Sequence, residues 1–131
     1  LILHTIGDIG VDGALYRSME FTGDVIERLP MHGRLTICNM AIEAGGKSGI
    51  IAPDNITENY IKNRAGRPYK FYSSDKDAKY MEVKEYDCSK IEPLVACPHT
   101  PWKSASRPES SKTPDRRTIA HGPQKRFSWP Q

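Results

Sequence analysis

The sequence predicts an α/β fold for residues 1–101, followed by a segment of different character. Three observations carry this prediction. Apolar residues with helical spacing alternate with short apolar runs typical of strands. Glycine, proline and aspartate separate these runs at short intervals. After Pro101 the sequence becomes rich in serine, proline and basic residues. Helices interleaved with short strands indicate a layered α/β domain, and 131 residues are enough for one domain with a modest core.

The first third of the chain predicts two helices and a strand. Apolar residues with helical spacing predict a helix over 1–10, and the alternation over 15–21 predicts a strand. Asp24 is placed to cap a short helix over 25–29, which Pro30 ends.

The middle of the chain predicts two further helices. The first covers 35–44, with the glycine pair that follows it as its C-terminal stop. The apolar run 48–52 predicts a strand, and then Asp54 or Thr57 can cap a second helix. The remaining strands are expected at 81–86 and 93–97.

Residues 102–131 are predicted to be a disordered basic tail rich in serine and proline. They carry seven Lys/Arg and two Asp/Glu, whereas residues 1–101 carry 12 basic and 14 acidic side chains. Such a composition buries too little apolar surface to offset the ordering entropy. The abrupt change at Pro101 is also typical of a segment translated in a shifted reading frame. Because the excess positive charge lies in this tail alone, a nucleic-acid partner is not expected.

The composition also indicates the cellular compartment of the protein and whether the chain can bind a metal. No apolar run is long enough to span a bilayer, and the start lacks the basic region of a signal peptide, so no membrane partner is expected. Cys38, Cys88 and Cys97 form neither a disulfide framework nor a C-x-x-C. We therefore expect a reducing, cytoplasmic compartment and no metal ligands in this chain.

The segment T-I-C-N-M-A-I-E-A-G-G places two polar residues in a helix that is apolar almost all round. Asn39 and Glu43 are four residues apart and share one helical face. The pattern predicts that this helix is buried on most sides, where an unpaired carboxylate is costly. Two interpretations stay open from the residues alone. Glu43 either reaches solvent or a neighbouring backbone group, or it forms a functional pair with Asn39, beside small residues that leave room for a ligand.

The same segment, continuing through K-S-G-I-I-A-P-D, resembles the large subunit of 3-isopropylmalate dehydratase in the aconitase superfamily, whose members share T-x-x-N-M-x-x-E-x-G. The resemblance extends upstream through I-G-D-I-G-V-D-G-A-L-Y-R-S-M-E-F-T-G and downstream through I-E-P-L-V-A-C-P-H-T-P. It covers nearly all of residues 1–101. It implies that these residues are an internal fragment of that subunit, part of a three-layer α/β/α domain, and that the tail is unrelated to the family.

The resemblance implies a hydro-lyase that interconverts 3-isopropylmalate and 2-isopropylmalate in leucine biosynthesis, with a 4Fe-4S cluster and a small partner subunit. In that family the Asn and Glu of this helix point into the active site. Carried onto this chain, Asn39 lies near the cluster without being a ligand, and Glu43 helps the substrate hydroxyl to leave as water. The family's cluster cysteines lie in G-S-C-T-N and C-x-x-C segments that this sequence lacks, so the chain alone is expected to be inactive.

Three other functions remain open at this point. The first is a homoaconitase or aconitase-type hydro-lyase of another pathway, acting on a different hydroxy-dicarboxylate or tricarboxylate. The second is an RNA-binding module that uses the basic tail. The third is a non-catalytic remnant, which would expose apolar surface meant for missing neighbours.

Overall fold

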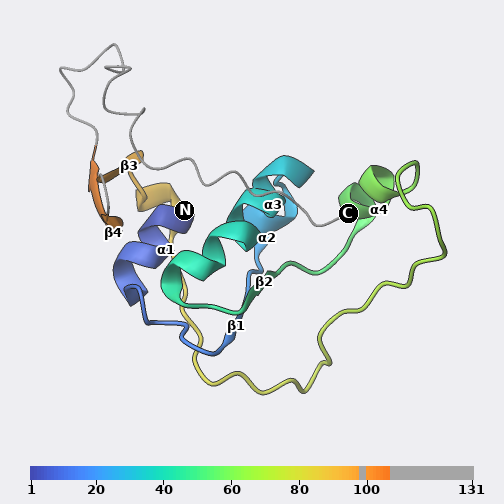
Figure 1. Cartoon of the computed structure of the whole chain (residues 1–131), viewed down its shortest axis with the longest axis horizontal. Helices are drawn as coiled ribbons and strands as arrows, with labels where there is room; N and C mark the ends of the chain where they lie inside the picture. The colour runs from blue at the N-terminus through green and yellow to red at the C-terminus, as the bar shows by residue number, and fades with distance from the viewer. Residues whose placement is uncertain (98–99, 107–131) are drawn as a thin grey trace, which may run out of the picture.

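The structure, a computed structural model, describes residues 1–97 and 100–106, and the side chains of residues 1–97. It confirms the mixture of helices and strands that the sequence predicts (Figure 1). In chain order the elements are α1 (Ile2–Ile9), β1 (Ser18–Glu20), α2 (Asp24–Glu27), α3 (Met31–Met40), the 3₁₀ helix η1 (Ala41–Ala44), β2 (Ser48–Ile50), α4 (Asn55–Ile61), the 3₁₀ helix η2 (Cys88–Lys90), β3 (Leu94–Cys97) and β4 (Thr100–Ser106). Within the described residues, no helix has the length and apolar character needed to cross a membrane.

Strands β1 and β2 form a parallel pair in which Met19 lies opposite Gly49. The helices α2, α3 and η1 make the connection between them, as parallel strands require. Helix α3 packs against β2 so closely that a Cβ atom at Gly49 would lie 2.6 Å from the Cα atom of Cys38. Only glycine fits at this crossing, so any larger residue there would push α3 away from the sheet.

The hydrophobic core lies between this sheet and the first three helices. Its buried residues are Ile2, Ile6, Ala14, Ile26, Ile37 and Ala44. Ile6 and Ala44 are fully buried, so α1 and η1 meet at the centre of the core. Helix α4 contributes no buried residue and must be held by other contacts.

A buried arginine supplies those contacts. Arg34 in α3 has only 2 % of its surface exposed, and its Nη1 and Nη2 atoms donate to the two carboxylate oxygens of Asp54 at 2.8 and 2.6 Å. Its Nε donates to the carbonyl of Leu29 at 3.0 Å, and Nη2 also donates to the carbonyl of Glu27 at 2.7 Å. This Arg34–Asp54 clamp joins the end of α2, the first turn of α3 and the start of α4.

Asp54 is also the N-cap of α4. Its Oδ1 accepts hydrogen bonds from the backbone N–H groups of Ile56 and Thr57 at 3.0 and 3.1 Å. Of the two cap residues that the sequence offered, Asp54 therefore performs the role. A single carboxylate satisfies both the helix terminus and the buried guanidinium.

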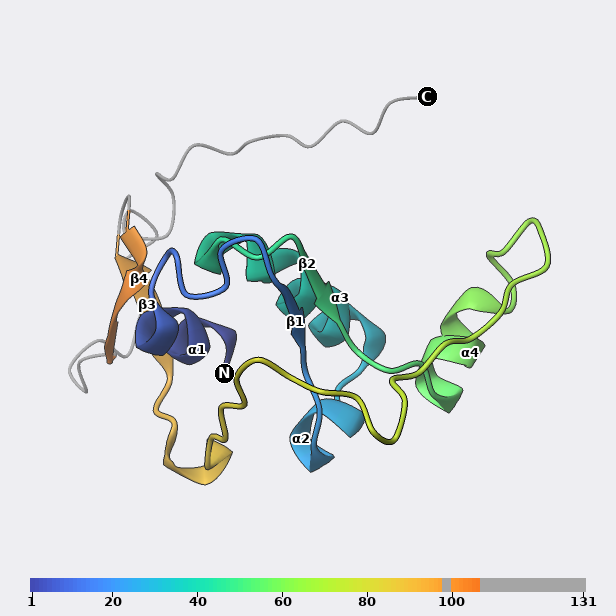
Figure 2. The same ribbon diagram turned by 90° about the horizontal axis from the view of Figure 1, so that it is seen from below.

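Residues 62–87, the returning segment, contain no helix or strand and run back from α4 to α1 along the side of β1 (Figures 1 and 2). Polar side chains hold the segment at several points. The contacts are Ser74 and Tyr80 with Glu20, Glu82 with Arg17, and Lys84 and Tyr86 with Asp8. Burial, together with the hydrogen bond to Asp8, raises the pKa of Tyr86 to about 12.

The strand predicted at 81–86 is wrong, although the alternation that suggested it is real. The polar residues of the alternation face the body of the molecule and make the contacts just described. The apolar residues Met81 and Val83 face solvent, with 79 % and 70 % of their surface exposed. Side-chain hydrogen bonds thus take the place of the backbone ladder that a strand needs.

Other boundaries also differ from the sequence predictions. The helix predicted over 25–29 begins at Asp24 and has Gly23 as its N-cap, so the expected cap by Asp24 is wrong. The helix expected over 35–44 begins earlier, at Met31, because Pro30 serves as its N-cap instead of only ending α2. Residues 102–106, which the sequence analysis assigns to the tail, belong to β4, which pairs with β3 in antiparallel fashion. Main-chain pairing on an open strand edge does not depend on apolar side chains. His99 and residues 107–131 lie outside the described residues.

Removal of the clamp's guanidinium tests its contribution to stability. We expect Arg34→Met to lower the free energy of unfolding by roughly 2–3 kcal/mol, because it leaves the Asp54 carboxylate and two carbonyls without their donor. The measurement is urea unfolding of the chain followed by circular dichroism. Arg28→Met is the control, since its ion pair with Asp24 is exposed and is worth at most about 1 kcal/mol. Equal losses in the two variants would contradict the clamp's role.

The clamp also predicts acid sensitivity. The hydrogen bonds from Arg34 lower the pKa of Asp54 from 3.8 to about 2. Because the folded-state pKa is depressed, the stabilisation is complete above about pH 4 and is lost as the pH falls towards about 2. We expect the thermal midpoint to fall across this window, and Asp54→Asn to flatten the fall. An identical slope in wild type and Asp54→Asn would show that other carboxylates cause the acid sensitivity.

Candidate functional site

Asn39 and Glu43, the residues singled out in the sequence, lie where α3 passes into η1. Asn39 is the next-to-last residue of α3, and Glu43 lies in the single turn of η1. Both side chains are exposed. Glu43 therefore reaches solvent, and its carboxylate does not face the core.

The prediction that this helix is buried on most sides is wrong for the described residues. Of the residues of α3, only Arg34 and Ile37 are buried. Leu35 has 47 % of its surface exposed and Ile42 has 66 %. The apolar composition suggested burial all round, but within the described residues only one side of the helix meets the sheet and the other helices.

The exposed side forms one continuous surface. Leu35, Asn39, Ile42 and Glu43 are spaced by four, three and one residues, which places them along one side of the helix. We call these four residues the open α3–η1 face. It carries a carboxylate and an amide beside two apolar side chains, on the side of the helix away from the core.

The backbone around Glu43 is fixed on both sides. Ala41 and Ala44 are fully buried, and the backbone N–H of Ala14 donates to the carbonyl of Ala44 at 2.9 Å. Gly45 then ends η1 in the left-handed conformation, with a φ of 79° that favours glycine. Glu43 therefore projects from a turn that the core holds rigid, although its own side chain is free.

A cation lies at the same end of the sheet as η1. The ammonium of Lys47, just before β2, sits 5.3 Å from the ring centroid of Tyr16, just before β1. Tyr16 has a φ of 61°, which is rare for a bulky residue. The contact between Lys47 and Tyr16 was not predicted, because no sequence pattern indicates that a tyrosine will adopt a left-handed backbone conformation.

The clamp residue Arg34 was also missed from the sequence. The available signal was its place on the helix, three residues before the buried Ile37 and therefore on the buried face. A charged residue on such a face requires a partner, and Asp54 was already recognised as a capping carboxylate.

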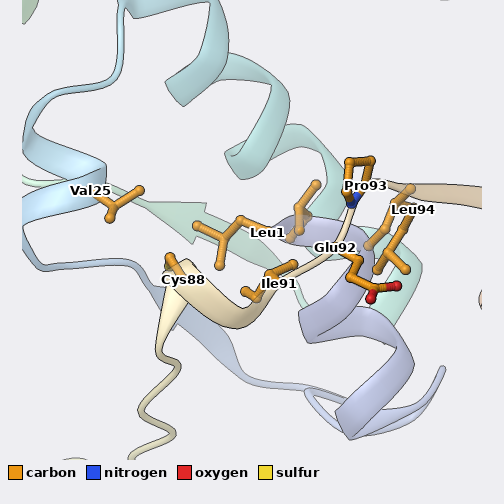
Figure 3. Close-up of a pocket in the computed structure, with 9 residues that line it drawn as sticks. Leu1, Val25, Cys88, Ile91, Glu92, Pro93 and Leu94 are labelled. Atoms are coloured by element: carbon orange, nitrogen blue, oxygen red, sulfur yellow. The ribbon is translucent and has the colours of Figure 1, made fainter. Parts of the chain in front are cut away.

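Two cavities of the molecule lie away from the open α3–η1 face. One of about 350 Å³, shown in Figure 3, has a largely apolar lining. It is lined by Leu1, Ile2, Leu3, Val25, Cys88, Ile91, Glu92, Pro93 and Leu94. A second, larger cavity lies between the returning segment and the elements α1, β1 and α2. Neither lining includes Asn39 or Glu43.

The cysteines do not fit an iron–sulfur cluster. Cys38 lies in α3, Cys88 in η2 and Cys97 at the end of β3, and all three are free and half-buried. Burial raises the pKa of the Cys38 thiol, whereas cluster ligands are thiolates. In the part of the chain that the structure describes, no three His, Cys, Asp or Glu side chains come together as metal ligands.

Comparisons with known proteins identify the family. The sequence model described as "Aconitase family (aconitate hydratase)" matches residues 1–127. The chain therefore belongs to the aconitase family.

Within this family, the chain is similar to proteins named 3-isopropylmalate dehydratase large subunit. It is 70 % identical to that of Thermodesulfovibrio yellowstonii and 69 % identical to that of Heliobacterium modesticaldum, each over 101 residues that make up 77 % of this chain and 24 % of the relative. It is 60 % identical over 112 residues to large subunit 1 of Pyrococcus furiosus, covering 86 % of this chain and 26 % of the relative. The chain thus spans about a quarter of the length of the curated relatives it matches.

The residues that these matches cover include part of the predicted tail. The family match continues past Pro101 to residue 127, and some relatives align over more than 101 residues. The boundary at residue 101 and the shifted reading frame therefore stay predictions.

Proposed function

We propose that this chain forms part of a hydro-lyase of the 3-isopropylmalate dehydratase type, which interconverts 3-isopropylmalate and 2-isopropylmalate by dehydration and rehydration. The observation that carries the proposal is the open α3–η1 face, which presents Asn39 at the end of α3 and Glu43 on the fixed turn that follows. The names of the relatives support the same reaction. Since the chain spans about a quarter of these relatives, the remaining catalytic groups would come from outside it.

In this proposal the two side chains have separate tasks. Dehydration removes a proton from one carbon and a hydroxyl group from its neighbour, and the hydroxyl must gain a proton to leave as water. Glu43, an exposed carboxyl group on a fixed turn, would give this proton and take it back during rehydration. Asn39, one helical turn earlier, would donate its amide N–H to hold the substrate in position. The base that removes the carbon-bound proton lies outside this chain.

The electrostatics of this end of the sheet suit an acidic substrate. Lys47 lies at the end of the sheet where η1 lies, and a dicarboxylate needs cations nearby. The leucine and isoleucine of the open face would contact an alkyl substituent, such as the isopropyl group, by burying apolar surface.

The wider assembly is part of the proposal. A two-stranded parallel sheet is small, and parallel sheets are normally covered on both faces, so residues 1–101 would contribute to a three-layer α/β/α domain completed by other segments. The 4Fe-4S cluster of the family would be held by cysteines outside this chain, because its own three do not fit. The relatives are named as large subunits, which supports a small partner subunit. The free cysteines favour the cytoplasm.

A second candidate is an aconitase-type hydro-lyase that acts on another hydroxy-dicarboxylate or tricarboxylate, such as the homoaconitase reaction. The description of the family model, aconitate hydratase, favours keeping it. The relatives are named as enzyme subunits, which does not favour an RNA-binding module or a non-catalytic remnant.

Replacement of the carboxyl group tests the role of Glu43. In the enzyme assembled with its small subunit, we expect Glu43→Gln to lower kcat for 3-isopropylmalate by about 10²–10⁴-fold, the range for loss of an acid–base group. The thermal midpoint should not change, because the side chain is exposed. Glu85→Gln, an exposed glutamate of the returning segment, is the matched control. Wild-type turnover in Glu43→Gln would return Glu43 to a structural role.

The chain without other segments should hold no stable cluster. After anaerobic treatment with iron and sulfide, we expect iron content far below one cluster per chain and no dehydration of 3-isopropylmalate, because the cysteines lie on separate elements. Iron and acid-labile sulfide analysis with visible absorption is the measurement. The large subunit from Thermodesulfovibrio yellowstonii, treated in parallel, is the positive control. Stoichiometric cluster on this chain would refute the expectation.

A further inference from the structure

The strongest feature outside the candidate site is the stretch from the end of α4 into the returning segment. Between Glu58 and Asp75 the sequence has no acidic residue. Residues 60–72, which we call the basic-aromatic segment, combine four cations with four aromatic rings. These residues are Lys62, Arg64, Arg67 and Lys70, and Tyr60, Tyr69, Phe71 and Tyr72. All eight side chains are exposed.

The cations of this segment have no carboxylate partners among the described side chains. The ion pairs that the structure describes use other cations, namely Arg17, Arg28, Arg34, Lys84 and Lys90. Among the described side chains, Lys47, Lys76 and Lys79 also form no ion pair, but only in the basic-aromatic segment do four such cations follow one another with no acidic residue between them. The segment is a concentrated source of positive potential on a body whose residues 1–101 are net acidic.

Aromatic rings hold two of these cations in place. The guanidinium of Arg64 lies 4.2 Å from the ring centroid of Tyr60 and also donates to the backbone carbonyl of that residue at 2.6 Å. The ammonium of Lys70 lies 5.1 Å from the ring centroid of Tyr72. These cation–π contacts limit the freedom of long side chains, so less entropy is lost when a partner binds them.

The segment lies at the end of the molecule farthest from β3 and β4, as Figures 1 and 2 both show. Its first residues belong to α4, whose start is fixed to α3 by the Arg34–Asp54 clamp. The charged and aromatic segment thus begins on a helix that the body holds in place and continues into the returning segment.

We propose that the basic-aromatic segment is a docking surface for an acidic polypeptide segment of a second protein subunit. Charge complementarity is the main argument, since four unpaired cations attract and orient an acidic partner. Arginine and tyrosine are also the residue types enriched at protein interfaces. A single-stranded nucleic acid fits less well, because base stacking needs free ring faces and one face of Tyr60 and one face of Tyr72 are each covered by a cation of the chain itself. The proposal is independent of the hydro-lyase reaction.

Binding of a fluorescent deca-glutamate peptide to the full chain, measured by anisotropy at low and moderate salt, tests the proposal. The test variant is Lys62→Gln with Arg67→Gln, two exposed side chains of the segment. The control is Arg116→Gln with Arg117→Gln, which removes the same charge from the basic tail. We expect the test variant to bind about tenfold or more weakly, and the control to change by less than about twofold. Circular dichroism verifies that both variants keep the fold.

Three results would overturn the proposal. The first is no binding of deca-glutamate by the wild-type chain. The second is equal weakening in the two variants, which would show that net charge alone attracts the peptide. The third is tighter binding of a ten-nucleotide oligothymidine that the test variant abolishes, which would assign the surface to nucleic acid.

Discussion

The arrangement of the helices depends on one buried guanidinium. Arg34 has almost no exposed surface, and three of its donor groups are used by Asp54 and by the two carbonyls at the end of α2. An arginine in such a place is tolerated only when its partners are all present, so α2, α3 and α4 must adopt one relative position. The apolar core of this chain is small, and α4 adds nothing to it. Specific polar contacts therefore fix the relative positions of α2, α3 and α4, which apolar packing alone would not determine.

The position of the candidate residues follows from this constraint. On one side, α3 is fixed by Arg34 at its first turn, by Ile37 in the core and by the close crossing of Cys38 over Gly49. These contacts leave the opposite side exposed, where Asn39 and Glu43 lie. Catalytic groups are most precise when they stand on rigid elements whose backbone is held from behind. The candidate site therefore depends on the packing of the opposite side of α3 as well as on Asn39 and Glu43 themselves.

The sequence predicted what depends on neighbours along the chain and failed where distant contacts decide. The Gly45 stop and the Asp54 cap are local, and both were predicted correctly. The segment 81–86 alternates like a strand, but its side chains contact Asp8 and Arg17, which are distant in the sequence, and these contacts hold the segment without strand pairing. The sequence analysis overestimated the burial of α3. The apolar content of a helix shows how much surface it could bury, but it does not show which of its sides contact other elements. Residues 102–106 pair with β3 through the backbone, which composition does not reveal.

The clamp also connects the two surfaces that the structure exposes. Asp54 accepts hydrogen bonds from Arg34 of the site helix and from the first turn of α4, and the basic-aromatic segment begins on the last turn of α4. If a partner binds α4 only when the helix is fully formed, binding stabilises the formed helix over a partly unfolded one by mass action. Because that form includes the paired Asp54, the same binding would stabilise the packed position of α3. Docking at one end of the molecule would in that case favour the packed position of α3, the helix that carries Asn39.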